Sequence, residues 1–260
     1  MTLEVINSSE NANYKKLKKL AGAARDRRKT GQTVLDGTHL LFSLAESQYQ
    51  PECIVVREDS LENDEIQECL DLFSDTKVLT FSKKLFNTLS PVETPVGILA
   101  IIEIPATETK HYTSGLLLED IQDPGNLGSI IRTAAGAGIE AVYLSKACAE
   151  AWSPKALRAG MGAQFNVAIH ENKDLTSVAK GFDKVIATEL GATQSIYEVD
   201  LSGAVAFIFG NEGGGLSSPL LERATNRVNI PMPGEIESLN VAASVAVCLF
   251  ERVRQINLLI

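Results

Sequence analysis

The chain has 260 residues, of which 22% are charged and 45% hydrophobic. This composition is typical of a globular protein with one large or two ordinary domains, and it excludes a disordered or membrane-embedded chain. The net charge of −9 argues against a general nucleic-acid coat, because non-specific binding to phosphates comes mostly from Lys and Arg.

No targeting signal or metal motif is evident in the sequence. The first ten residues lack the basic start and apolar stretch of a secretory signal. The longest apolar stretch, 241–250, is too short to span a bilayer at about 20 residues, and we expect it to form a buried helix. The four cysteines lie far apart without a C-x-x-C pair, as expected for reduced thiols. We therefore expect a cytoplasmic protein with no metal and no membrane contact.

Positive charge is concentrated near the amino terminus, where residues 15–29 contain one acid, Asp26. The basic residues of this segment are Lys15, Lys16, Lys18, Lys19, Arg25, Arg27, Arg28 and Lys29. A polyanion such as RNA would meet the chain first at this segment. The alternative is a solvated helix face, because Leu17, Leu20 and Ala24 recur at helical spacing and would dock the helix on a core. Both interpretations can hold together.

The chain divides at the polar stretch 105–113, and the first part alternates helices and strands with short connections. This rhythm predicts a small α/β domain. The expected elements are a helix at 8–29, a strand at 33–35, a helix at 39–45, a strand at 53–56, a helix at 61–73, a strand at 78–80, a helix at 83–89 and a strand at 97–104.

The second part alternates in the same way, and several of its strands are continuous apolar runs, as in a parallel sheet covered on both faces. The pattern alone predicts a doubly wound sheet and would not predict a knot, because threaded chains are nearly absent from known folds. The expected strands are 116–121, 141–144, 166–169, 184–188, 204–209 and 227–230, and the expected helices are 126–137, 154–161, 174–180 and 238–256.

Three polar, glycine-bearing motifs follow expected strands, where an open parallel sheet places its ligand-binding loops. The first motif, 123–132, places Asn126 at a helix start behind the turn Pro124-Gly125, with Arg132 six residues further on. Backbone N–H groups and a guanidinium at this position predict a phosphate or ribose site. The alternative is that Asn126 only caps the helix and Arg132 pairs with an acid on the surface.

The second motif, 209–216, contains the run Gly213-Gly214-Gly215, which allows the backbone to approach a ligand, and Glu212, which supplies an acceptor. It lacks the G-K-[ST] ending of a nucleoside-triphosphate loop. The stretch 136–141 matches a dinucleotide fingerprint by letters. It follows an expected helix and precedes a strand, whereas the fingerprint must open a helix, so we interpret it as a helix C-cap.

The third motif, 230–240, is stiffened by Pro231 and Pro233 and leads into the last helix. Ser238 is the expected N-cap of that helix. Asn240 is expected to face the interior in the first turn of an apolar helix, and a buried amide needs a polar partner.

In this order and spacing the three motifs resemble the SpoU/TrmH family of S-adenosylmethionine-dependent RNA 2′-O-ribose methyltransferases, a branch of the SPOUT superfamily. The resemblance implies a deep trefoil knot in a domain at 113–260 and a homodimer formed through it. The segment 15–29 leading into Thr33–Gly37 and His39 resembles an RNA substrate-binding domain like ribosomal protein L30e, at 1–108. Family members more often carry Glu-Gly where this chain has Asp36-Gly37.

The resemblance also implies roles for individual residues. It implies that Arg132 activates the ribose hydroxyl, organised by Asn126, Glu212, Ser238 and Asn240. The residues implied to bind the cofactor S-adenosylmethionine are Thr188, Gly210, Ile230, Met232 and Leu239. The residues expected to bind RNA are Lys15, Lys16, Lys19, Arg25, Arg27, Arg28, Lys29 and Arg158. In the segment 153–163 many members have Ser where this chain has Gly160.

The resemblance predicts an RNA 2′-O-methyltransferase, with ribosomal RNA favoured over transfer RNA as the partner because such an N-terminal domain most often accompanies rRNA-modifying members. A guanidinium is a poor base near neutral pH, so a role for Arg132 as the base has alternatives. Arg132 either acts as a base, holds a phosphate that takes the proton, or stabilises the developing alkoxide. One alternative is a catalytically silent RNA-binding module, which the retained motif residues oppose. Another is a nucleotide-dependent oxidoreductase, which the misplaced glycine fingerprint opposes.

Overall fold

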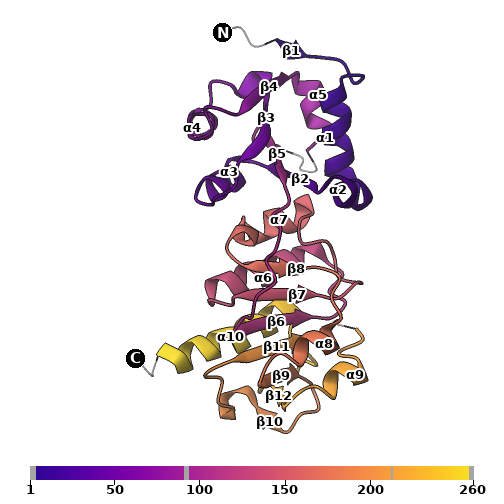
Figure 1. Cartoon of the computed structure of the whole chain (residues 1–260), viewed down its shortest axis with the longest axis vertical. Coiled ribbons are helices and arrows are strands. Elements are labelled where there is room, and N and C mark those ends of the chain that lie inside the picture. Colours follow the sequence, from indigo (N-terminus) through magenta and orange to yellow (C-terminus); the bar gives the residue numbers. More distant parts are fainter. Residues whose placement is uncertain (1–3, 91–93, 212, 258–260) are drawn as a thin grey trace. The chain divides into compact units, whose positions relative to one another are not determined.

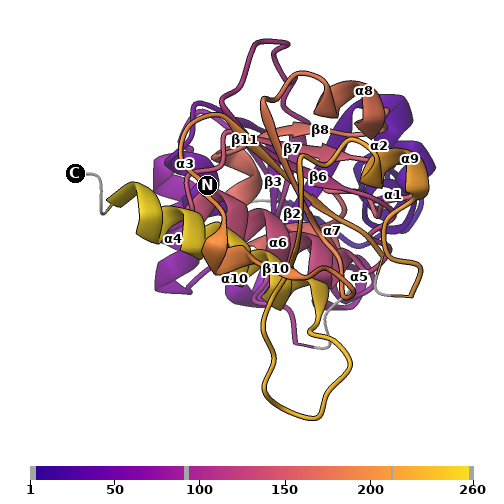
Figure 2. The same cartoon turned by 90° about the horizontal axis from the view of Figure 1, so that it is seen from below.

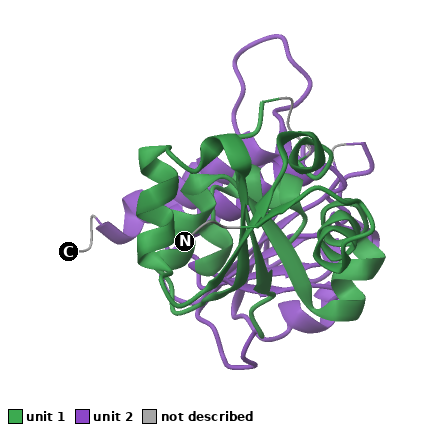
Figure 3. Ribbon diagram, turned by 90° about the horizontal axis from the view of Figure 1, so that it is seen from above, with its two compact units in different colours: residues 1–106, 152–165 green, residues 107–151, 166–260 purple. Residues whose placement is uncertain are grey.

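The computed structural model describes residues 4–90, 94–211 and 213–257. The chain forms two compact units, residues 1–106 with 152–165 and residues 107–151 with 166–260 (Figure 3). Each unit contains its own β-sheet with helices (Figure 1), which confirms the α/β class. The sequence places 152–165 in the second domain, whereas here this segment packs with the first unit. The functional division into 1–108 and 113–260 stays a prediction.

The first unit has a five-stranded sheet in the order β1-β4-β3-β5-β2, in which β5 is antiparallel to both β2 and β3. Helices α1 and α5 pack on one face through residues such as Leu17 and Phe86. The elements are β1 (Val5–Ile6), α1 (Ala12–Gly22), α2 (Ala24–Thr30), β2 (Gln32–Asp36), α3 (Thr38–Ala45), β3 (Pro51–Arg57), η1 (Glu58–Ser60), α4 (Asp64–Leu72), β4 (Lys77–Phe81), α5 (Lys83–Asn87), β5 (Ile98–Glu103), α7 (Pro154–Gly160) and η2 (Ala163–Phe165).

The basic segment near the amino terminus differs from the expected single helix. It breaks at Ala23, whose φ of −126° and ψ of 121° are extended, so that α1 and α2 are separate helices. The side chain of Asn11 caps α1 by accepting a hydrogen bond from the Asn13 N–H at 2.9 Å. The strand β1 was not expected, because two residues paired with β4 are too few to show an alternating pattern.

The second unit has a seven-stranded sheet in the order β10-β12-β9-β11-β6-β7-β8, and its strand pairs are all parallel. Helices α6 and α10 cover one face, and α8 and α9 the other (Figure 2). The elements are β6 (Ser114–Leu118), α6 (Pro124–Gly136), β7 (Ala141–Leu144), β8 (Ala168–His170), α8 (Leu175–Ala179), β9 (Lys184–Thr188), β10 (Gln194–Ser195), η3 (Ile196–Glu198), β11 (Val205–Phe209), α9 (Ser218–Leu221), β12 (Asn226–Asn229) and α10 (Val241–Asn257).

This strand order explains how the three motifs meet. Strands β12, β9, β11 and β6 are neighbours in the sheet, and parallel neighbours present their carboxyl ends at the same edge. The loops that carry the motifs follow β6, β11 and β12. The loop at 230–240, between β12 and α10, projects from the unit in Figure 2. The trefoil knot remains a prediction. None of the helices in the described ranges combines the length and apolar character of a membrane span.

Candidate active site

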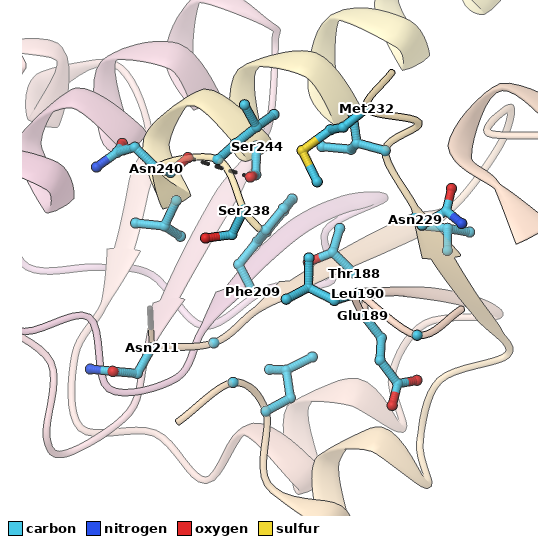
Figure 4. A pocket seen from close by; sticks show the side chains of 18 of the residues that line it. Thr188, Glu189, Leu190, Phe209, Asn211, Asn229, Met232, Ser238, Asn240 and Ser244 are labelled. Atoms are coloured by element: carbon cyan, nitrogen blue, oxygen red, sulfur yellow. Dashed lines mark hydrogen bonds between the residues drawn. The ribbon is translucent and has the colours of Figure 1, made fainter. Parts of the chain in front are cut away.

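A cavity of about 860 Å³ lies at the carboxyl ends of β9, β11 and β12 in the second unit (Figure 4). Its volume is in the range of small-molecule sites. The five residues expected to bind the cofactor, Thr188, Gly210, Ile230, Met232 and Leu239, all line it. The structure therefore brings them together from separate strands, and their contact with a cofactor stays a prediction. The expected catalytic residues Ser238 and Asn240 also line this cavity.

One wall of the cavity is the segment that we name the glycine loop, residues 210–211 and 213–217. The Gly215 N–H donates to the Asn211 carbonyl at 2.8 Å, which closes the loop on itself. A Cβ on Gly210 would collide with the Gly215 carbonyl, so this position requires glycine. Gly215 has a φ of +64°, in the left-handed region. Glu212, an expected catalytic residue, lies outside the described residues.

Asn211 joins the glycine loop to the turn that precedes the first motif. Its Nδ2 donates to the carbonyl of Asp120 at 2.9 Å, and its Oδ1 accepts hydrogen bonds from the N–H groups of Gly213 at 2.8 Å and Gly214 at 3.3 Å. The sequence motif predicts no role for Asn211 itself. An Asn ahead of a glycine run, two residues beyond a buried strand, is the sequence signal that would have identified it.

The turn that leads from β6 into the first motif is held by Ser145 and Cys148. Asp120 adopts a positive φ of +57°, and its N–H donates to the Ser145 hydroxyl at 2.9 Å. Burial raises the pKa of the Cys148 thiol, which keeps it protonated. The thiol donates to the Leu118 carbonyl at 3.2 Å and accepts from the Ile121 N–H at 3.3 Å. These bonds stabilise a backbone conformation that costs free energy in a non-glycine residue.

The start of α6 differs from the expected start at Asn126, and Asn126 is not the helix cap that the alternative interpretation makes it. The helix begins at Pro124, and Asp123 is its N-cap, with Oδ1 accepting from the Asn126 N–H at 2.8 Å. The Asn126 side chain instead accepts a hydrogen bond from Asn240 Nδ2 at 3.2 Å. This bond places the first and third motifs side by side.

The start of α10 also differs from the expectation. The helix begins at Val241, and Asn240, not Ser238, is its cap, because the Asn240 Oδ1 accepts from the Ala242 N–H at 2.9 Å. Asn240 is exposed and not buried. Its carbonyl accepts from the Ser244 hydroxyl at 3.3 Å (Figure 4). Ser238 is exposed beside the cavity, so its hydroxyl is accessible to a ligand.

Arg132 is not brought to the cavity. It is exposed on α6 and forms no ion pair with any residue in the described ranges. Six residues of helix rotate the side chain by roughly 120° from the direction of Asn126, which explains why the two diverge. The surface ion pair of the alternative interpretation is therefore not seen within the described part of the chain, and the catalytic role of Arg132 stays a prediction.

The expected RNA-binding residues fall into different environments. Arg27 is only 5% exposed, and its guanidinium donates to the Leu20 carbonyl at 2.6 Å. Its guanidinium is therefore occupied within the first unit, and its expected contact with RNA stays a prediction. Lys15 and Lys16 are paired with Glu10 and Glu52.

The other basic positions are more open. Lys19, Arg25 and Lys29 are exposed and form no ion pair with described residues, and Arg28 is also exposed. Arg158 is half-buried on α7. Burial of Asp36 raises the pKa of its carboxyl, and the positive charge of Arg158 opposes this rise.

The cavity also contains polar residues that the sequence did not single out. Glu189 follows β9, with its N–H bonded to the Val228 carbonyl at 2.9 Å, and its carboxylate lies 3.7 Å from an Arg227 nitrogen. Asn229 ends β12, and its side chain donates to the Ala192 carbonyl at 2.5 Å. Both residues line the cavity (Figure 4).

Residues 114–250 match the SpoU rRNA Methylase family, and residues 11–100 match the MRM3-like substrate binding domain. The 23S rRNA guanosine 2′-O-methyltransferase RlmP of Bacillus subtilis is 32% identical, with 95% of this chain and 98% of the relative covered. The mitochondrial rRNA methyltransferase 3 of Xenopus laevis is 30% identical over 94% of this chain and 74% of the relative.

Solved structures agree with these matches. A crystal structure of an RNA 2′-O ribose methyltransferase, 27% identical, superimposes with a TM-score of 0.83 and covers 98% of this chain and 100% of its own. An rRNA methyltransferase from Sinorhizobium meliloti with bound AdoMet, 24% identical, covers 97% of this chain and 98% of its own at a TM-score of 0.84 and shares the fold.

The parallel sheet gathers the loops of the second and third motifs around one cavity, and the family match places this cavity in an RNA methylase domain of the SpoU type. The chain belongs to the SpoU rRNA methylase family. The stretch 136–141 begins at the last residue of α6 and ends at the first residue of β7, so it closes a helix, as the C-cap interpretation predicts. The oxidoreductase alternative is therefore wrong.

Proposed function

We propose that the protein transfers a methyl group from S-adenosylmethionine to the ribose 2′-hydroxyl of a nucleotide in ribosomal RNA. The observation that supports this most is the cavity at the strand ends, because loops from the second and third motifs line it and the first motif is hydrogen-bonded to the third. The names of the full-length relatives, which are rRNA methyltransferases, favour ribosomal over transfer RNA. A silent RNA-binding module is the remaining alternative.

The residues of the cavity fit a nucleoside cofactor. Phe209, Ile230, Met232 and Leu239 supply apolar surface, and Gly210 leaves its backbone open to close approach. Ser238 and Asn229 also line the cavity and supply polar groups. When bound, S-adenosylmethionine supplies a methyl group on a sulfonium that is already electrophilic, so the protein chiefly has to align donor and acceptor.

The roles of the polar residues belong to the same proposal. The Asn126–Asn240 hydrogen bond fixes the starts of α6 and α10 relative to each other, which supports a role in positioning the incoming ribose. Glu212, next to Asn211, is proposed to take part with them. Arg132, two turns along α6, is proposed to act on the ribose hydroxyl as a base, through a phosphate, or on the developing alkoxide.

The proposal also includes a homodimer formed through the knotted second unit, in the cytoplasm. The resemblance implies this assembly, and Phe250 on α10, 50% exposed, is available to such an interface. Sedimentation of the whole chain would decide the oligomeric state. If the protein is strictly monomeric and still methylates RNA, the proposed dimer is wrong and the proposed activity stands.

The test is to incubate the purified protein with labelled S-adenosylmethionine and total RNA and to map the methylated nucleotide. We expect label on a ribose 2′-oxygen in ribosomal RNA. Label found only on transfer RNA would show that transfer RNA, and not ribosomal RNA, is the substrate. Cofactor and RNA binding without label in any RNA would favour the silent module.

A further inference from the structure

The glycine loop is fastened to the rest of the second unit by Glu119, a residue outside the three motifs. Glu119 immediately follows β6, and its own N–H donates to the Phe209 carbonyl at 2.9 Å. Its carboxylate accepts two hydrogen bonds from Ser217, one from the N–H to Oε2 and one from the hydroxyl to Oε1, both at 2.7 Å. Hydrogen bonds to an ionised acceptor are the stronger kind.

The two attachments hold opposite ends of the same loop. At its start, Asn211 bonds the Asp120 carbonyl at 2.9 Å. At its end, Ser217 bonds Glu119. Between these points lie Gly213, Gly214 and Gly215, all of which line the cavity. A run of three glycines has more conformational freedom than any other tripeptide, so the shape of this wall depends on how its ends are held.

We propose that Glu119 is a positioning residue for the methyl donor, holding the glycine loop in the shape that the cofactor requires. The inference rests on the proposed function, because it assumes that S-adenosylmethionine occupies this cavity. Glu119 does not line the cavity, so its effect on affinity acts through the loop. When the binding shape is only partly populated, the apparent dissociation constant rises by the inverse of that fraction.

The variant that tests this is Glu119→Gln, which keeps the size of the side chain and removes one acceptor. Glu140→Gln is the matched control. Glu140 accepts from the Thr113 N–H at 2.5 Å and from the Thr113 hydroxyl at 3.1 Å, the same pair of donors in the same unit. It lies beside the start of β6, the end of the strand that is remote from Glu119.

Calorimetry with S-adenosylhomocysteine is expected to show about tenfold weaker binding for Glu119→Gln, as when the loop spends about a tenth of its time in the binding shape. Ser217→Ala should weaken binding similarly, and the double variant should weaken it no further than the stronger single change. Hydrogen exchange of the amides of Gly213 to Ser217 should become faster in Glu119→Gln. Glu140→Gln should keep wild-type affinity and wild-type exchange in this loop.

Equal affinity in the wild type and Glu119→Gln would overturn the proposal. So would an equal loss in Glu140→Gln, because a general loss of stability would then account for both. Failure of the wild type to bind S-adenosylhomocysteine at all would instead refute the proposed function, which keeps the two failures distinguishable.

Discussion

At the scale of single residues, Arg132 is predicted to affect methyl transfer, and the residues that line the cavity are predicted to affect cofactor binding. Arg132 is exposed on α6 and does not line the cavity, so Arg132→Ala should abolish methyl transfer and leave cofactor affinity within about twofold of the wild type. Single-turnover transfer and calorimetry measure the two quantities. Arg223→Ala, which removes another exposed arginine of the same unit, is the control and should keep both. Retained turnover in Arg132→Ala would remove this residue from the mechanism.

The variant Leu239→Asp should have the opposite effect to Arg132→Ala. Leu239 lines the cavity, and an unpaired carboxylate against an apolar wall costs free energy. Cofactor binding should therefore fail first. The same change at Leu72, which is 52% exposed in the first unit, should leave binding unchanged. Unaltered affinity in Leu239→Asp would mean that the cofactor does not reach this wall.

His170 predicts a pH dependence of stability. Its ring is 7% exposed, stacked on Tyr143 at 4.7 Å, and its Nε2 has no hydrogen-bond partner in the described part of the chain. Burial, aided by the charge of Lys173, lowers the pKa of His170. Between this lowered pKa and the unfolded value of about 6.5, the unfolded chain binds a proton that the folded chain does not. The free energy of unfolding should therefore fall as the pH drops below about 6.5.

Chemical denaturation from pH 7.5 to 5.5 measures this slope; those limits bracket the histidine value of about 6.5. His170→Phe keeps an aromatic ring and removes the proton site, so its slope should be flatter. His39→Phe changes an exposed histidine and should keep the wild-type slope. Identical slopes for His170→Phe and wild type would show that other groups determine the acid sensitivity.

At the scale of elements, helices α1 and α2 are predicted to supply most of the long-range attraction for RNA. Lys19 and Arg25 are exposed without ion pairs to described residues, in a chain with net charge −9. Reversing both to Glu should weaken RNA binding by about tenfold or more at low salt and reduce the dependence of affinity on salt concentration. The measurement is RNA binding across a salt series.

The control reverses Lys77 and Lys84, two exposed lysines of the same unit, with the same change in net charge. It should weaken binding less. Equal losses for the two pairs would mean that only total charge matters, and equal affinity to the wild type would mean that α1 and α2 form a solvated face.

At the scale of the whole molecule, the packing of residues 152–165 with the first unit changes what a fragment of residues 113–260 should do. The cavity lies wholly within residues 188–244, so the fragment should still bind cofactor. In the full chain the Thr33 hydroxyl donates to the Trp152 carbonyl at 2.6 Å, and Trp152 and Leu157 are buried. The fragment lacks Thr33 and the rest of residues 1–106, so residues 152–165 should become a site of proteolysis.

The fragment should also lose most of its RNA affinity and show a shallower salt slope, because it lacks the basic segment 15–29. Limited proteolysis, calorimetry and RNA binding measure the three properties. Protection of 152–165 equal to that in the full chain would show that this segment folds without the first unit. If the fragment and the full chain have equal RNA affinity and equal salt slope, RNA recognition has to be sought around Arg132 and Arg158.

Much of this architecture is determined by the sequence alone. Continuous apolar runs such as 204–209 predict buried parallel strands, because both faces of the sheet are covered. The order of the three motifs predicts the family and the class of chemistry. These signals are local, and each depends on a few consecutive residues, so they survive without knowledge of the fold. The predicted strands and helices agree with the structure to within a few residues, apart from the break at Ala23. The short elements β1, β10, α9, η1, η2 and η3 are not predicted by the sequence.

The tertiary structure decided which of these residues meet and what they do. The order of the strands places β11 between β9 and β6. These pairings join segments far apart in the sequence, and only this order brings the loops of the second and third motifs to one cavity, with the first motif hydrogen-bonded to the third. Asn240 and Asp123 became helix caps, Arg27 became buried, and Glu119 became the partner of Ser217. Each of these roles depends on a neighbour that folding supplies, so the identity of the residue alone does not determine it.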